Sequence, residues 1–204
     1  MAATKYNMSF TTGGVFHQES VEFAKVFLSL QDWKAVRKKA LERNLVRSRT
    51  KSSSVRVCRE ICKRLELLNV EELKILIEGS VQEQQQILWL AICRRYRFIY
   101  DFAVEIIREK YLNLNTGIYP EDYDAFFNTK ATWHNELEDL TDKTRAKLRQ
   151  VLFRILKETE VLGKDNTINP SILTSRVVKV VSQQGLNDLA IFPASEAEIK
   201  ELLQ

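Results

Sequence analysis

The segment RSRTKSSSVRVCREICKRL, residues 47–65, combines a helical pattern of apolar residues with an excess of positive charge. Arg56, Arg59 and Lys63 fall on one face of the expected helix, and serines 52–54 supply its N-cap. The apolar residues recur every three or four positions on the opposite face: Val55, Cys58, Ile61, Cys62, Leu65 and Leu68. The segment therefore predicts an amphipathic helix with a basic outer face.

Composition extends this helical prediction to the whole chain. The 204 residues are 45% hydrophobic, enough for a substantial core, and include only 3 Pro and 6 Gly. Few turn-forming residues, together with abundant Leu, Glu, Lys, Arg and Gln, favour helices. We expect an all-α, compact helical protein organised as residues 1–115 and 116–204, packed as one globular body. The boundary is placed where Asn, Gly and Pro cluster, at 113–120.

Two helices and a basic linker form a first helix-turn-helix-like unit. Asp32 is a good N-cap for a helix over 33–44, and a helix over 17–30 precedes it. The basic helix over 53–66 follows. The loop between the last two is longer than the usual turn of about three to four residues.

The next helices are also marked by their caps. Asn69 caps a helix that Gly79 closes, and Ser80 with Glu83 forms a capping box. The helix that follows, over 81–95, is apolar enough to be central.

A second helix-turn-helix-like unit is expected near the C-terminus, from helices over 141–161 and 170–184. Asn169 is its expected cap and Pro170 its first helical residue. The apolar residues that follow, at 186–192, are ambiguous between helix and strand, and a short wing is one alternative.

Charge is concentrated in one part of the chain. Residues 34–64 contain twelve Lys or Arg and two acids, a net charge of +10, whereas the whole chain carries +4. The remaining residues are therefore net acidic. A strong local excess within an otherwise acidic protein indicates a polyanionic partner.

The first candidate site is a phosphate-binding surface on the linker and the basic helix. Its expected DNA-binding residues are Arg47, Arg49, Lys51, Ser53, Arg56, Arg59 and Lys63. Arg and Lys side chains, hydroxyl groups and helix N-termini all suit phosphate oxygens. A solvated helix face is the alternative. Such a face normally carries both positive and negative side chains, whereas residues 34–64 contain twelve Lys or Arg and only two acids.

The second candidate site lies on the second helix pair. Its expected DNA-binding residues are Lys143, Lys147, Arg154, Ser175, Arg176, Lys179 and Gln183. Arg and Gln can read guanine and adenine edges in a major groove. An ordinary amphipathic helix with incidental polar residues explains the pattern equally well.

Aromatic and arginine residues alternate in CRRYRFIYDF, residues 93–102. Exposed, these aromatic rings could stack on single-stranded bases. On a helix they more often pack into the core, while the arginines bind acids such as Asp101 and Glu105. Cys58 and Cys62 are expected to be reduced core residues.

No sequence pattern indicates an enzyme or a cofactor. The chain lacks phosphate-binding-loop, dinucleotide-binding, zinc-protease and nucleophile-elbow motifs. His17 and His134 lie far apart without a matching acid or Cys pattern, so structural roles are expected. The longest apolar run, at 87–93, is too short to span a bilayer. We therefore expect a cytoplasmic protein without catalytic residues, metal or cofactor.

Several long strings resemble the BrxA family of bacterial bacteriophage-exclusion (BREX) systems: TTGGVFHQES, DWKAVRKKALERNLVRSRT, EQQQILWLAICRRYRFIYDF and KTRAKLRQVLFRILKETEVL. The resemblance covers nearly the whole sequence. It implies an all-helical, non-enzymatic protein with helix-turn-helix units that binds double-stranded DNA, in a system that also contains a methyltransferase and ATPases.

Charge and resemblance together favour a double-stranded DNA-binding accessory protein of phage defence. Two alternatives remain open. The basic face could dock the acidic surface of another defence component. Otherwise the chain could bind RNA, which would require exposed aromatics at 93–102.

Overall fold

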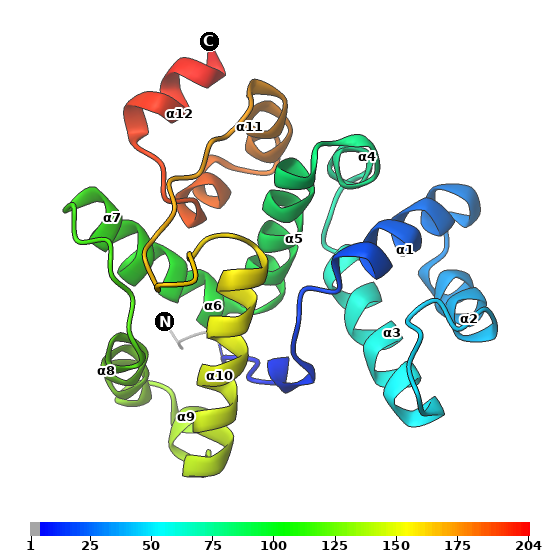
Figure 1. The fold of residues 1–204 in the computed structure, drawn as a ribbon, viewed down its shortest axis with the longest axis horizontal. Coiled ribbons are helices and arrows are strands. Elements are labelled where there is room, and N and C mark those ends of the chain that lie inside the picture. Colours follow the sequence, from blue (N-terminus) through cyan, green and yellow to red (C-terminus); the bar gives the residue numbers. More distant parts are fainter. Residues whose placement is uncertain (1–4) are drawn as a thin grey trace. The chain divides into compact units, whose positions relative to one another are not determined.

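The computed structural model describes residues 5–204, and in these the chain is helical, with no β-strand (Figure 1). This confirms the predicted all-α class. The chain divides into two compact units. Unit 2 is Val15–Arg95, and unit 1 contains the segment that ends at Gly14 together with Tyr96–Gln204.

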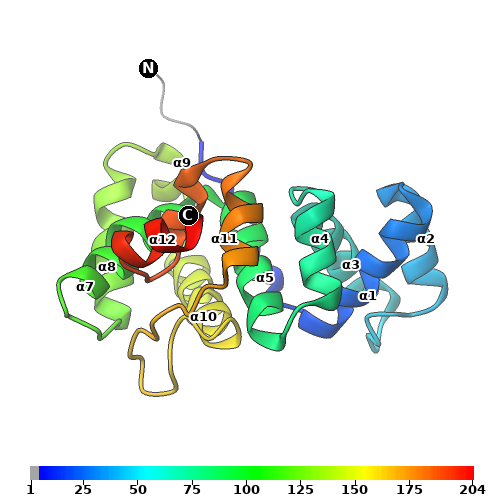
Figure 2. The same cartoon turned by 90° about the horizontal axis from the view of Figure 1, so that it is seen from above.

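Unit 2 is a five-helix unit (Figure 2). Its helices are α1 (His17–Leu30), α2 (Trp33–Glu42), α3 (Lys51–Leu65), α4 (Val70–Glu78) and α5 (Val81–Arg95). Helix α1 packs against the other four, and α2 lies along α3. The predicted order of helices in this part of the chain is therefore confirmed.

The caps explain why these helices begin where they do. The Asp32 carboxylate accepts a hydrogen bond from the Lys34 N–H at 2.9 Å. Asn69 and Glu72 form a reciprocal capping box at the start of α4, and Ser80 and Glu83 do the same for α5. Because each cap satisfies backbone N–H groups that have no partner inside the helix, the first turns are fixed locally.

Unit 1 contains helical elements of very different lengths, from 3 residues in η1 to 17 residues in α10. They are η1 (Phe10–Thr12), α6 (Arg97–Phe102), the π-helix η2 (Ala103–Arg108), α7 (Glu109–Leu112), α8 (Pro120–Ala131), α9 (Asn135–Glu138), α10 (Asp142–Glu158), α11 (Ser175–Ser182), the 3-10 helix η3 (Leu186–Ile191) and α12 (Glu196–Leu203). Its core is aromatic: the Phe98 ring lies edge-on to Tyr6, Tyr123 and Phe126.

Helix α3 begins one residue before the serines that were expected to cap it. Thr50 is the N-cap, and its hydroxyl accepts a hydrogen bond from the Ser53 N–H at 3.2 Å. The prediction of a serine cap at 52–54 was wrong, since all three serines lie inside the helix. The basic linker therefore ends at Thr50.

The second helix-turn-helix-like unit has no short turn. Helix α10 ends at Glu158 and α11 begins only at Ser175, with Thr174 as its cap. The predicted start at Pro170 was wrong because the N–H groups of Asn169 and Ser171 donate instead to the carbonyls of Val161 and Pro193. These long-range bonds hold the segment in an extended form.

The segment expected to be ambiguous, 186–192, is helical rather than a wing. Residues Leu186–Ile191 form η3, which packs against α11 and the π-helix. The only bridges of β type in the described residues are isolated ones, Gly117 with Thr167 and Leu162 with Ile168.

The chain passes between the two units twice, between Gly14 and Val15 and between Arg95 and Tyr96. The Asn-, Gly- and Pro-rich segment at 113–120, where a boundary was expected, lies within unit 1. Whether the expected regions 1–115 and 116–204 behave as domains stays a prediction.

Candidate nucleic-acid interface

Helix α3 presents its cations to solvent because most of its apolar stripe is buried inside unit 2. Cys58, Ile61 and Leu65 are each at most 1% exposed. On the other side, Arg56, Arg59 and Lys63 are exposed, as the periodicity predicted. Val55, at the start of the predicted stripe, is itself 36% exposed. The burial of the stripe fixes the rotation of α3 and so the direction of its cations.

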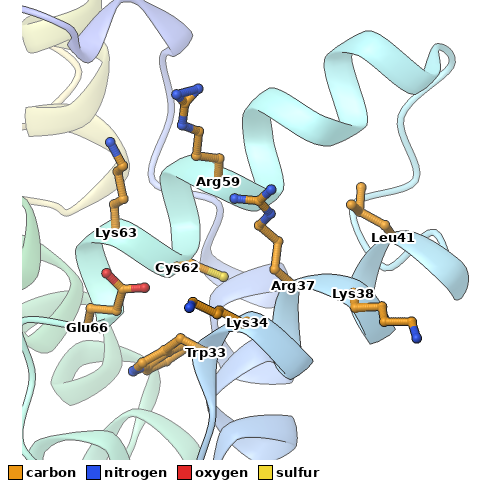
Figure 3. Close-up of a pocket in the computed structure, with 9 residues that line it drawn as sticks. All are labelled: Trp33, Lys34, Arg37, Lys38, Leu41, Arg59, Cys62, Lys63 and Glu66. Carbon is orange, nitrogen blue, oxygen red and sulfur yellow. The ribbon is translucent and has the colours of Figure 1, made fainter.

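Helices α2 and α3 enclose a basic groove of about 560 Å³. Its lining consists of Trp33, Lys34, Arg37, Lys38, Leu41, Arg59, Cys62, Lys63 and Glu66 (Figure 3). Figure 3 shows the Arg37 side chain directed from α2 toward Arg59 on α3, whereas the Lys38 side chain points away from α3. Two helices that are neighbours in sequence thus bring their cations to one place.

Most cations of this groove have no acidic partner in the described part of the chain. Within residues 5–204, Lys34, Arg59 and Lys63 form no ion pair or hydrogen bond through their side chains. Lys38 comes only within 4.0 Å of Glu42. Elsewhere in the chain arginines are commonly paired, as Arg97 is with Asp101 at 2.7 Å. The basic charge of α2 and α3 is therefore available to an external anion.

The linker before α3 and the first residue of α3, Lys51, add further exposed cations. Arg47, Arg49 and Lys51 are all exposed. Arg47 adopts the left-handed conformation, with a φ of 45°, in the turn where its N–H donates to the Asn44 carbonyl. Ser53 is a weaker candidate because it is half-buried and its hydroxyl accepts a hydrogen bond from Thr50 at 2.9 Å.

One cation of the basic segment does not belong to the surface. Arg64 is 3% exposed, and its Nε donates to Glu60 at 2.7 Å. Glu60 is itself buried. The opposite charges of Arg64 and Glu60 cancel each other inside unit 2. The surface therefore carries one cation and one acid fewer than the sequence count indicates.

The candidate residues of unit 1 lie on two helices. Lys143, Lys147 and Arg154 are exposed on α10. Arg154 pairs with Glu158 at 2.6 Å and Lys147 donates to Gln150 at 3.0 Å, so each of the two cations already has one polar partner in the protein. Lys143 has no such partner within the described residues.

Helix α11 carries the other four candidates of unit 1. Ser175, Arg176, Lys179 and Gln183 are all exposed. Three valines on the opposite side of the helix are fully buried. The sequence therefore predicted the outward face of α11 correctly, although not where the helix begins.

The aromatic residues at 93–102 belong to the core. Tyr96, Phe98 and Phe102 are fully buried. Tyr100 is half-buried, and its hydroxyl donates to the Asn187 carbonyl. Because buried rings cannot stack on bases, the observation that would have favoured RNA binding is missing from this segment.

The cysteines and histidines have structural surroundings. The three cysteines are buried free thiols, and burial raises the pKa of Cys62 to about 12. His17 Nε2 lies 2.7 Å from Gln84 Oε1, and the His134 ring stacks on Tyr6. No group of three His, Cys, Asp or Glu side chains in the described part of the chain could hold a metal ion.

Sequence reasoning missed the role of Trp33. In the sequence, Trp33 has the helical spacing of Val36 and Ala40, which are both fully buried. It is instead half-buried, stacks on Phe27 at 4.1 Å and lines the groove. Its position at the first residue of α2 was the available signal, since a helix terminus can border both core and surface.

Fold and surface together define an all-helical protein with a concentrated patch of unpaired cations on two adjacent helices. The family model described as BrxA matches residues 4–185, and the chain belongs to that family. No helix among the described residues is long and apolar enough to cross a membrane.

Two curated relatives carry the same description, "BREX protein BrxA". The protein from Bacillus cereus (strain H3081.97) is 26% identical over 127 residues, which are 62% of this chain and 64% of that protein. The protein from Escherichia coli O9:H4 (strain HS) is 23% identical over 146 residues, 72% of this chain and 68% of that protein. The match thus spans less than two thirds of the Bacillus protein.

A solved structure shares the fold. The crystal structure of an uncharacterized protein from Magnetospirillum magneticum superposes with a TM-score of 0.74 at 18% sequence identity. The match covers 92% of this chain and 96% of that one.

Proposed function

We propose that this protein is a double-stranded DNA-binding component of a bacterial phage-defence system of the BREX type. Membership of the BrxA family supports the defence role, since both curated relatives are named BREX proteins. The observation that carries DNA binding is the set of unpaired cations on α2, the linker and α3.

Electrostatics favours a polyanion on this surface. Cations held close together without acids repel one another, and a bound anion relieves that repulsion. Duplex DNA offers a regular array of phosphates and gains affinity from each counterion that it releases. Arg47, Arg49, Lys51, Arg56, Arg59 and Lys63 contact phosphates in this proposal, whereas Ser53 contributes little.

Helix α11 is the candidate for reading bases. Its exposed Arg176 and Gln183 suit purine edges, with Ser175 and Lys179 beside them. The cations of α10, Lys143, Lys147 and Arg154, would add phosphate contacts from the same unit. We place the protein in the cytoplasm, and we propose the methyltransferase and ATPases of such a system as its protein partners.

Charge reversal tests the proposal. The double variant Arg56→Glu and Arg59→Glu should weaken binding of a labelled duplex at least about tenfold at low salt, because each change removes a phosphate contact and adds repulsion. A matched control, Lys25→Glu with Lys74→Glu, changes net charge equally at two lysines that are already paired with acids. Fluorescence anisotropy measures both.

The control should retain most of the wild-type affinity. Equal affinities of the wild type and the α3 double variant would remove α3 from the interface. If the wild type binds neither duplex DNA, single-stranded DNA nor RNA at low salt, the basic face docks an acidic protein surface instead.

A further inference from the structure

The groove between α2 and α3 has two chemically different parts. Its walls carry cations, whereas Trp33, Leu41 and Cys62 supply apolar lining. The outside of a DNA duplex presents phosphates and sugars, and these polar groups do not pack against apolar side chains. A volume of about 560 Å³ is in the range of sites that enclose a small organic group.

The indole ring of Trp33 is held in one orientation by Phe27 and is partly exposed. The ring lies on Phe27 with the centroids 4.1 Å apart and the planes 12° from parallel. This contact fixes the orientation of the indole while leaving it partly exposed at the groove. Partly exposed aromatic rings next to cations are typical of sites for unpaired bases.

Glu66 marks the end of the groove that does not suit a phosphate. It is the only acid in the lining, and Figure 3 shows it at the same end as Trp33. A carboxylate repels phosphate but accepts hydrogen bonds from the amino group of a base. The guanidinium groups of Arg37 and Arg59 lie further along the groove.

From this arrangement we propose that the groove binds an unpaired nucleotide, its base against Trp33 and its phosphate on Arg37, Arg59 and Lys63. The proposal rests on the DNA binding proposed above and narrows its substrate to DNA with an unpaired end or gap. A free nucleotide has the same chemistry, and the experiment separates the two sources.

Two labelled hairpins of one duplex sequence, one blunt and one with a three-nucleotide overhang, provide the test. The wild type should bind the overhang hairpin at least about fivefold more tightly, a ratio set by base stacking. Trp33→Leu should bring the ratio close to one, and Trp33→Phe should restore most of it. Trp133→Leu is the matched control, because Trp133 is 79% exposed in unit 1.

The ratio is independent of whether blunt DNA binds strongly, so it separates this proposal from DNA binding itself. Deoxyadenosine monophosphate is titrated alone, with tryptophan fluorescence of Trp133→Leu as the readout. Quenching by the mononucleotide at micromolar concentration would support the site and assign it to free nucleotide. Equal affinity for both hairpins without such quenching, or a ratio that is unchanged in Trp33→Leu, overturns the proposal. An acidic peptide would then be the ligand that best fits the groove.

Discussion

Glu72 forms a buried ion pair with Arg94 inside unit 2. Its side chain is fully buried, and both carboxylate oxygens accept hydrogen bonds from Arg94, at 2.7 and 2.8 Å. One of them also accepts the Asn69 N–H. Removing the carboxylate would leave the guanidinium of Arg94, which also donates to the Leu67 carbonyl, without its acid in a mostly buried position.

We therefore predict that Glu72→Ala lowers the free energy of unfolding by about 3–5 kcal/mol, as expected for breaking one side of a buried ion pair. The control Glu71→Ala removes an exposed carboxylate that pairs with Lys74, and should change stability by less than about 1 kcal/mol. Urea denaturation followed by circular dichroism measures both. Similar losses in the two variants would contradict this assignment.

The buried thiols give a prediction about reactivity. Burial raises the pKa of Cys58 and takes that of Cys62 to about 12. Only the thiolate reacts, and the raised pKa keeps Cys62 almost entirely in its unreactive thiol form at pH 8. The folded protein should therefore label slowly with a disulfide reagent, and all 3 cysteines should react in denaturant. Rapid native labelling at pH 8 would show that α3 is less well packed.

Individual cations show where sequence reasoning reaches its limit. Arg59 and Arg64 lie in the same helix, yet Arg59 is exposed and unpaired whereas Arg64 is buried and paired with Glu60. Periodicity correctly placed Arg56, Arg59 and Lys63 outside. It could not assign Trp33 to the groove, because that depends on how α2 packs against α3.

At the scale of helices, local signals were reliable and long-range ones were not. Caps predicted the starts of α2, α4 and α5, because a cap acts within the first turn of its helix. The start of α11 depends on backbone bonds to residues distant in sequence, Val161 and Pro193. No local pattern contains that information.

The cap of α3 can be tested directly. Thr50→Ala removes the hydroxyl that accepts the Ser53 N–H, and should lower the free energy of unfolding by about 1 kcal/mol. Ser52→Ala is the control, since Ser52 is exposed and its side chain has no hydrogen bond in the described chain; a change below about 0.5 kcal/mol is expected. A larger loss of stability in Ser52→Ala than in Thr50→Ala would indicate that a serine caps α3.

At the scale of the whole molecule, the two units differ in how much unpaired charge they offer. Unit 2 carries exposed cations on α2, the linker and α3 that mostly lack acidic partners, whereas Arg154 and Lys147 of unit 1 already have polar partners. Both candidate surfaces could be predicted from sequence, but their relative strength could not, because pairing is a property of the folded chain.

We predict that Lys143→Glu with Lys179→Glu weakens duplex binding by less than Arg56→Glu with Arg59→Glu, although both change the net charge equally. The expected difference is about tenfold at low salt. Anisotropy titrations of the two variants under identical conditions make the comparison. A larger loss in the unit 1 variant would move the main interface to α10 and α11.

The salt dependence of duplex binding tests the central claim most directly. If about six phosphates are contacted, the logarithm of the association constant should fall with the logarithm of salt concentration at a slope of about −5. Arg56→Glu with Arg59→Glu should reduce the magnitude of that slope by about two. A wild-type slope near zero, or no duplex binding at low salt, would contradict a phosphate-binding surface on α2 and α3.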